Sequence, residues 1–288
     1  MRSNTKGPLL IALTAVLWSF GGLLIKLIPW DAMTIVGLRA LIAAIVMAVY
    51  MRRVRITFSP AVILGALCMA GTTILFVFAN KLTSAANAIV LQYVSPIFVL
   101  IFSALFFGKR FRAFDIAAVV VVFFGIALFF FDGLEPGVML GNILAVLAGV
   151  CFAGVFLINQ MKDAKPEESL LLGHIFNGVI SIPFIVTHLT FEPLPWLYIS
   201  LLGVFQLGIA YVLFSIGIKT TPPVTASLIA TLEPLLSPVW VLLLTGEKPG
   251  LFALIGGVVV LGTVVAYSVH SARRLNAEKE PAPAGQTL

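Results

Sequence analysis

A carboxylate interrupts one of the longest apolar stretches of the sequence: Glu233 lies within TASLIATLEPLLSPVWVLLL, residues 225–244. Burial of a charge at the centre of a bilayer costs about 2.5 to 3.5 kcal/mol even on insertion scales, so such a residue is a candidate for function. Pro234 and Pro238 follow it, and a proline lacks the amide that would bond the carbonyl four residues earlier. A carboxylate beside freed carbonyls can bind an ammonium group or a proton.

A third proline, Pro96, occupies the matching place in an earlier apolar stretch. We expect Pro96, Pro234 and Pro238 to kink or gate their helices. A structural alternative stands beside this interpretation. In it the helices are kinked for packing alone, and Glu233 is neutral and hydrogen-bonded to a neighbouring helix.

Two more ionisable residues lie inside apolar stretches, Arg39 and His174. Arg39 could pair with a carboxylate or extend its charged head to the outer surface, and we expect a structural role for it. His174 begins the spaced polar row His174, Asn177, Ser181. A lone histidine of this kind is more typical of packing than of proton transfer.

Aromatic and amide side chains form the second group of candidates. Aromatic rings can stack on an apolar group or hold a cation, and amides and hydroxyls can bond the polar end of a ligand. The residues expected to bind substrate are Trp18, Phe76, Asn80, Gln92, Tyr93, Ser95, Phe152, Phe205, Gln206, Tyr211, Glu233 and Trp240.

Motifs for enzymatic chemistry are missing from the sequence. It has no G-x-x-x-x-G-K-[ST] nucleotide loop, no H-E-x-x-H zinc helix and no G-x-S-x-G nucleophile elbow. Cys68 and Cys151 lie in apolar runs without metal spacing. We therefore expect no catalytic residues, no metal and no cofactor. A membrane-embedded lipid enzyme, with His174 or His188 near Glu192 as base, is a remote alternative.

The composition is that of a membrane protein. Of 288 residues, 60% are hydrophobic and 10% charged, with a mean hydropathy of +1.12, against about 25% charged in soluble domains. At roughly 20 residues per bilayer crossing, the sequence divides into ten helices, at 8–28, 32–51, 61–79, 84–107, 114–131, 139–160, 168–187, 195–217, 224–245 and 250–269.

Positive charges orient these helices, since Lys and Arg concentrate in cytoplasmic loops. With the N-terminus inside, the cytoplasmic segments hold fourteen Lys and Arg and the outer segments three, with Arg39 inside a helix. Both termini are thus predicted to be cytoplasmic, and the polar tail 273–288 disordered. The net charge of +6 orients helices here, and no nucleic-acid partner is expected. We predict a multi-pass protein of a bacterial inner membrane, acting as a monomer.

The sequence contains an internal repeat. Shifted by 138 residues, positions 80–109 superpose on 218–247, with Pro96 over Pro234 and Gly108 over Gly246. This predicts two five-helix units, 1–134 and 135–272. Because five is odd, the second unit crosses the membrane in the opposite direction, which is typical of secondary transporters that bind substrate near the midplane.

The two repeats carry a family resemblance. LTSAANAIVLQYVSPIFVLIFSALFFGKRF and TLEPLLSPVWVLLLTGEKP resemble the EamA-type branch of the drug/metabolite transporter superfamily, and within it the YddG-type ten-helix exporters of aromatic amino acids. One departure is visible: the family often has an acid after the glycine that ends helix 4, where this sequence has Lys109, although the second copy has Glu247.

The resemblance implies alternating access through a midplane cavity lined by helices 1, 3, 4, 6, 8 and 9. It implies a cargo of small amphiphilic metabolites, amino acids with aromatic ones foremost, and some toxic hydrophobic or cationic compounds. A different small metabolite, such as a purine, is the alternative. The expected partners are this small molecule and the lipid bilayer.

Overall fold

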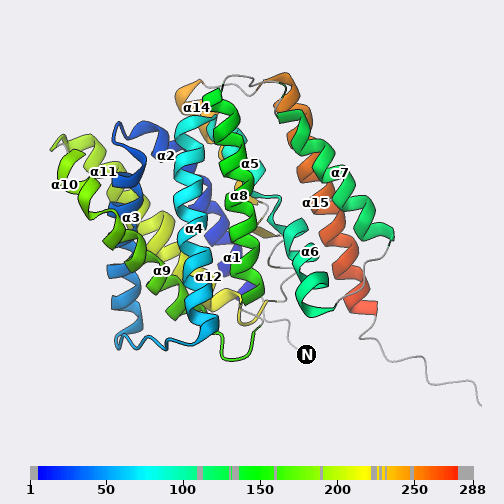
Figure 1. Cartoon of the computed structure of the whole chain (residues 1–288), viewed down its shortest axis with the longest axis horizontal. Helices are drawn as coiled ribbons and strands as arrows, with labels where there is room; N and C mark the ends of the chain where they lie inside the picture. The colour runs from blue at the N-terminus through cyan, green and yellow to red at the C-terminus, as the bar shows by residue number, and fades with distance from the viewer. Residues whose placement is uncertain are drawn as a thin grey trace, which may run out of the picture.

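The computed structural model describes residues 6–108, 113–129, 131, 136–158, 161–188, 191–221, 226, 229–230, 232–246 and 250–277. Every regular element within those ranges is a helix (Figure 1). Lys109 and Glu247, which differ in the two repeats, lie outside the described residues, and so does the tail beyond residue 277.

The helices follow one another along the whole described chain. Their bounds are α1 Lys6–Ser19, α2 Gly21–Leu27, α3 Ala32–Met51, α4 Pro60–Leu82, α5 Ala85–Gln92, α6 Ser95–Phe107, α7 Ala113–Phe129, α8 Pro136–Ile158, α9 Pro166–Ile180, α10 Ile182–His188, α11 Pro193–Leu201, the π-helix η1 Leu202–Ile209, α12 Ala210–Gly217, α14 Leu232–Thr245 and α15 Leu251–Ala277. The last helix, α15, continues to Ala277, so its end overlaps the start of the tail predicted at 273–288.

Six helical segments of the described chain are long and apolar enough to cross a bilayer. They are Lys6–Leu27, Ala32–Met51, Pro60–Leu82, Ala85–Phe106, Gly137–Leu157 and Pro193–Gly217. Shorter apolar helices cover Ala113–Leu128, Leu232–Leu244 and Leu251–Tyr267. The all-helical membrane class is therefore confirmed, and the ten-helix topology stays a prediction.

Local sequence signals explain where several helices begin. The Asp31 side chain accepts the Thr34 amide at the start of α3, at 3.0 Å. Ser59 accepts the Val62 amide before α4, and Ser84 accepts the Asn87 amide before α5. Each of these side chains pairs one of the amides that a helix N-terminus leaves without an intrahelical partner.

Three of the spans are irregular in their interior. The first breaks at Phe20, between α1 and α2. The fourth breaks between Gln92 and Ser95, and Pro96 accounts for the position because its ring clashes with the carbonyl of Gln92. The span at 193–217 contains the π-helical turns of η1, a geometry that is frequent at functional sites.

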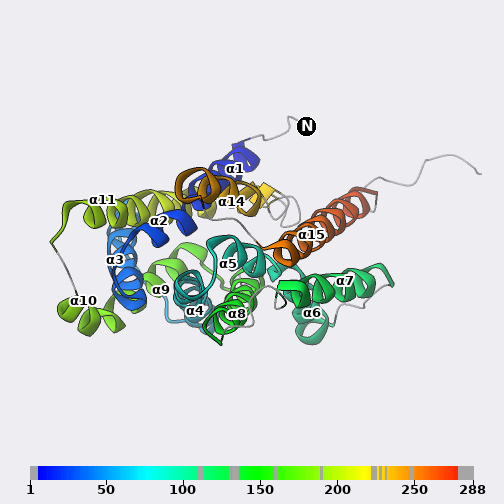
Figure 2. The ribbon, with the colours of Figure 1, turned by 90° about the horizontal axis from the view of Figure 1, so that it is seen from above.

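The helices form a bundle with a separate pair at one edge. In the bundle α4 packs against α8 and α9, and α3 packs against α9 and η1. Outside it, α7 and α15 run side by side, at the right of Figures 1 and 2. The irregular spans belong to the bundle, so their breaks lie within its interior.

Candidate functional site

A small polar cavity lies inside the bundle. It has a volume of about 30 Å³, room for only one or two water molecules. Its lining comes from α1, α3, α4, α5, α8, η1, α12 and α14, through Trp18, Arg39, Thr72, Thr73, Phe76, Gln92, Phe152, Gln206, Leu207, Tyr211 and Glu233. A ligand larger than water therefore requires these helices to move apart.

At Glu233, the acidic residue of the cavity, a hydrogen bond connects two parts of the chain that are distant in sequence. The Tyr93 hydroxyl, at the break after α5, lies 2.7 Å from Oε2 of Glu233. The same hydroxyl lies 3.0 Å from the carbonyl oxygen of Ala230. That carbonyl is the one left without a helical partner by Pro234. The proline thus supplies an acceptor directly beside the carboxylate.

Another part of the lining is apolar and consists of aromatic rings packed around Trp18. The Trp18 ring lies 5.2 Å from Tyr211, 5.4 Å from Phe214 and 6.2 Å from Phe152, measured between ring centroids. Such spacings and tilted geometries are favourable for aromatic pairs. The Trp18 indole nitrogen has no hydrogen-bond partner among the described residues. This wall can accept an apolar or aromatic group.

Arg39 brings a second charge into the cavity. Its side chain is 1% exposed, and its Nη2 donates to the carbonyl of Thr73 at 3.1 Å. The hydroxyl of the same residue, Thr73, accepts a hydrogen bond from the Asn177 amide at 2.5 Å. Arg39 Nε and Nη1 have no partner among the described residues.

Two amides complete the polar lining, Gln92 and Gln206. Each is largely buried, and the Oε1 atom of each has no partner among the described residues. Glycines lie close to both residues, Gly21 against the side chain of Gln206 and Gly149 against the backbone of Gln92. A Cβ at Gly21 would lie 2.8 Å from the Gln206 amide nitrogen, and one at Gly149 would lie 2.7 Å from the Gln92 carbonyl oxygen.

The structure gathers seven of the residues expected from the sequence on this cavity, namely Trp18, Phe76, Gln92, Phe152, Gln206, Tyr211 and Glu233. Tyr93 lies directly behind Glu233, to which it donates. Helices that are far apart in the sequence therefore meet at one place. These seven residues and Tyr93 are the expected site residues that lie together in the structure.

Other expected residues lie elsewhere. Asn80 and Ser237 approach the Cα of Gly22 on α2, and Asn80 is fully buried without a partner among the described residues. Trp240 donates to Ser19 at 3.0 Å. Phe205 is 47% exposed, so it faces outward from η1.

The remaining expected residues are the prolines and Ser95. Ser95 is buried at the start of α6 without lining the cavity. Pro96 lies in the first turn of α6 and Pro234 in the first turn of α14, and Pro238 falls inside α14. These positions place a proline close to each wall that carries Gln92 or Glu233.

Sequence reasoning missed Arg39, Thr72, Thr73 and Leu207 as cavity residues. For Arg39 the sequence favours a structural role, although its charge inside an apolar helix also makes it a candidate for function. Thr72 and Thr73 carried no such signal, because threonine hydroxyls commonly bond their own helix, as Thr72 does with the Cys68 carbonyl at 2.7 Å.

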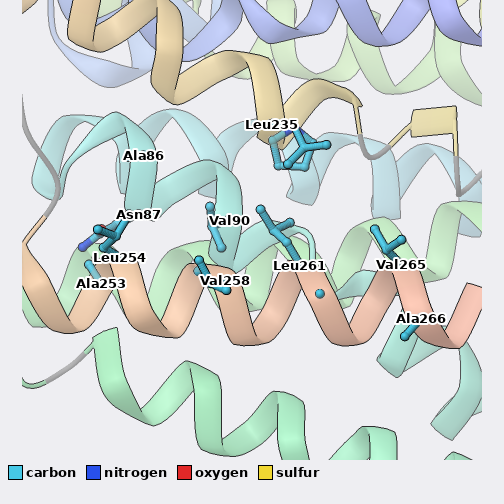
Figure 3. A pocket seen from close by; sticks show the side chains of 13 residues that line it. Ala86, Asn87, Val90, Leu235, Ala253, Leu254, Val258, Leu261, Val265 and Ala266 are labelled. Carbon is cyan, nitrogen blue, oxygen red and sulfur yellow. The ribbon is translucent and has the colours of Figure 1, made fainter.

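A larger cavity of the described chain lies elsewhere. A groove of about 570 Å³ runs between α5, α14 and α15 (Figure 3). Its walls are aliphatic, with residues such as Val90, Leu235 and Val258, and Asn87 is its polar exception. A groove of this composition suits hydrocarbon and lacks the charges of the small cavity, so we place the candidate site in the smaller one.

Metal chemistry finds no support among the described residues, which include no group of three or more His, Cys, Asp or Glu side chains that could hold an ion. His174 is fully buried, and both ring nitrogens have no partner among those residues. The side chain of His188, considered as a base for lipid chemistry, lies outside the described residues.

Comparison with known proteins identifies the family that the sequence matches. The sequence matches the EamA-like transporter family twice, over residues 5–131 and 139–269. An "Uncharacterized transporter" of Clostridium kluyveri is 25% identical over 295 residues, covering 91% of this chain and 93% of that protein. One of Archaeoglobus fulgidus is 26% identical over 285 residues, covering 91% and 96%.

A solved crystal structure has the same fold. It superposes with a TM-score of 0.65, covers 95% of this chain and 99% of its own, and is 21% identical in sequence.

Proposed function

We propose, since the chain belongs to the EamA-like transporter family, that this multi-pass membrane transporter is a bacterial inner-membrane exporter of small amphiphilic metabolites. Amino acids, aromatic ones foremost, are the proposed cargo, together with some toxic hydrophobic or cationic compounds. The ten helices of the proposed topology form two inverted five-helix units, with both termini in the cytoplasm. Residues 1–134 and 135–272 make up the two units.

One observation carries the proposed cargo: a carboxylate, Glu233, and a wall of aromatic rings around Trp18 line the same cavity. A carboxylate beside a carbonyl that has no donor within its helix suits an ammonium group, from which both oxygens can accept hydrogen bonds. Aromatic rings suit an apolar side chain and can also hold a cation. A molecule with an amine at one end and a ring at the other satisfies both walls.

The size of the cavity supports alternating access. At about 30 Å³ it has no room for a phenylalanine, so the cargo requires a second conformation in which the lining helices separate. Breaks at Phe20 and between Gln92 and Ser95 give two of those helices points at which to bend. Substrate sites at broken helices are typical of secondary transporters.

The cargo is tested by uptake into liposomes that contain the purified protein. The panel consists of labelled phenylalanine, tryptophan, leucine, glutamate, adenine and an aromatic amine drug. We expect uptake of the aromatic amino acids above protein-free liposomes, and competition by unlabelled aromatic amino acids. Uptake of adenine alone would replace amino acids with purines as the cargo, and the absence of uptake across the panel would contradict the proposal.

A further inference from the structure

The proposed binding of an amine by Glu233 and of a ring by the aromatic wall leaves the buried guanidinium of Arg39 without a role. It lines the cavity from α3, and of its three nitrogens only Nη2 has a hydrogen-bond partner, the Thr73 carbonyl at 3.1 Å. Nε and Nη1 are buried without a partner in the described chain. A guanidinium carries five N–H donors and stays protonated in proteins, so most of its donors are open.

No carboxylate among the described residues neutralises this charge. Arg39 forms no ion pair with a described acidic residue, and Glu233, in the same cavity, is bonded by Tyr93 instead. An isolated buried charge is costly, because it loses its hydration without a compensating partner. The cavity therefore contains a guanidinium whose donors are mostly open and, in the same lining, a carboxyl group that holds one hydrogen bond from Tyr93.

Packing holds the guanidinium in place. Glycine on each helix lets α3 and α9 approach closely: a Cβ at Gly37 would lie 2.3 Å from Cβ of Ser181, and one at Gly178 would lie 2.4 Å from a methyl of Leu41. On α4, Thr73 accepts from Arg39 through its carbonyl and from Asn177 through its hydroxyl. The cation is thus positioned by three helices.

We propose that Arg39 binds the carboxylate of the cargo, while Glu233 binds its ammonium group, so that the cavity is selective for zwitterions. A guanidinium and a carboxylate match as planar groups and can form two parallel N–H···O bonds. The proposal rests on the proposed function and adds to it the group that recognises the anionic half of an amino acid.

The test measures ligand protection against thermal unfolding of the purified full-length protein, with probes paired by charge. Phenylacetate is compared with phenylacetamide, and phenylalanine with phenethylamine, at constant ionic strength. The variants are Arg39→Gln, Arg39→Lys and a control, Arg53→Gln, which removes an exposed charge beyond α3. We expect the acids to bind Arg39→Gln about tenfold more weakly or worse than the wild type, and the control to match the wild type.

Phenylacetamide, which is neutral, should bind all variants alike, and phenethylamine should bind Arg39→Gln no more weakly than the wild type, because a like charge has been removed. Arg39→Lys, which keeps the charge and loses the planar fork, should weaken the acids less than Arg39→Gln does. If Arg39→Gln does not fold, Arg39→Lys provides the comparison by itself. Equal protection of wild type and Arg39 variants by the acids, or equal protection of the wild type by acid and amide, would overturn the proposal.

Failure of this proposal is distinct from failure of the proposed function. If liposomes take up no amino acid but acids still require Arg39, the cargo is wrong and the carboxylate site stands. If amino acids are taken up and the ratio of phenylalanine to phenethylamine affinity is the same with and without Arg39, the cargo stands and this site is wrong.

Discussion

The Tyr93 hydroxyl lies 2.7 Å from Oε2 of Glu233, although 140 positions separate the two residues. It also lies 3.0 Å from the Ala230 carbonyl, and its single proton can be donated to only one of these acceptors at a time. When Glu233 is protonated, it can donate to the tyrosine oxygen, and the tyrosine proton is then free for Ala230. We therefore expect the protonation of Glu233 and the helix kink at Pro234 to be coupled through this one hydroxyl.

Removal of that hydroxyl tests the link. Tyr93→Phe keeps the ring beside Phe152, whose centroid is 6.4 Å away, and leaves the buried Ala230 carbonyl without its donor. We expect uptake to fall and the free energy of unfolding to drop by about 1 to 3 kcal/mol. In a double-mutant cycle with Glu233→Gln the losses of uptake should be less than additive. Additive losses would mean that the two residues act separately.

The aromatic wall predicts a preference for rings. Phe152 is 4% exposed at the cavity and Phe205 is 47% exposed on the outside, so the two phenylalanines form a matched pair. Phe152→Leu should reduce the preference for phenylalanine over leucine about two- to tenfold, since an aromatic contact contributes about 0.5 to 1.5 kcal/mol. Phe205→Leu should leave that preference unchanged. Competition assays in liposomes measure both, and the reverse order would place the cargo elsewhere.

Gly149 on α8 predicts a steric effect at the break between α5 and α6. A Cβ there would lie 2.7 Å from the Gln92 carbonyl oxygen, the group that Pro96 leaves without a helical partner. Gly149→Ala should therefore lower the free energy of unfolding by about 1 to 3 kcal/mol. Gly137→Ala, on the same helix with nothing within 4 Å, should be neutral or slightly stabilising. Equal thermal unfolding of the two variants would contradict this packing.

The orientation of the chain is tested by labelling. In a variant without Cys68 and Cys151, single cysteines replace Arg53, between α3 and α4, or Phe191, between α10 and α11. The predicted topology places position 53 in the cytoplasm and position 191 outside. A membrane-impermeant maleimide should then label position 191 in intact cells and position 53 only after lysis. Labelling of position 53 in intact cells would reverse the topology.

Much of the site could be inferred from the sequence because charges and prolines are conspicuous in apolar helices. Glu233 is an example: its position alone indicated a function, and the structure places it on the polar cavity. The six long apolar spans follow from composition in the same way. Such features depend on short stretches of sequence, and they need no knowledge of how the helices pack.

Which side of a helix faces the cavity depends on packing and could not be predicted from the sequence. Phe205 and Gln206 are neighbours in the sequence, and both are expected from it to bind substrate. In the structure they lie on η1, with Gln206 on the cavity and Phe205 exposed on the outside. Arg39 could have faced the surface, and the close packing of α3 against α9 and η1 accounts for its burial. Helix rotation and local helix geometry are tertiary effects, so spacing along the chain does not determine them.

Uptake by Glu233→Gln, measured in liposomes with and without a pH gradient, tests the role of this cavity in transport. The substitution preserves the size of a side chain that is 7% exposed and removes its charge. We predict a protein that unfolds at nearly the wild-type temperature and takes up amino acids at least about tenfold more slowly, as expected for the loss of a hydrogen bond to a charged group. Unchanged uptake of every substrate, in both conditions, would contradict the assignment of Glu233 to the transport site.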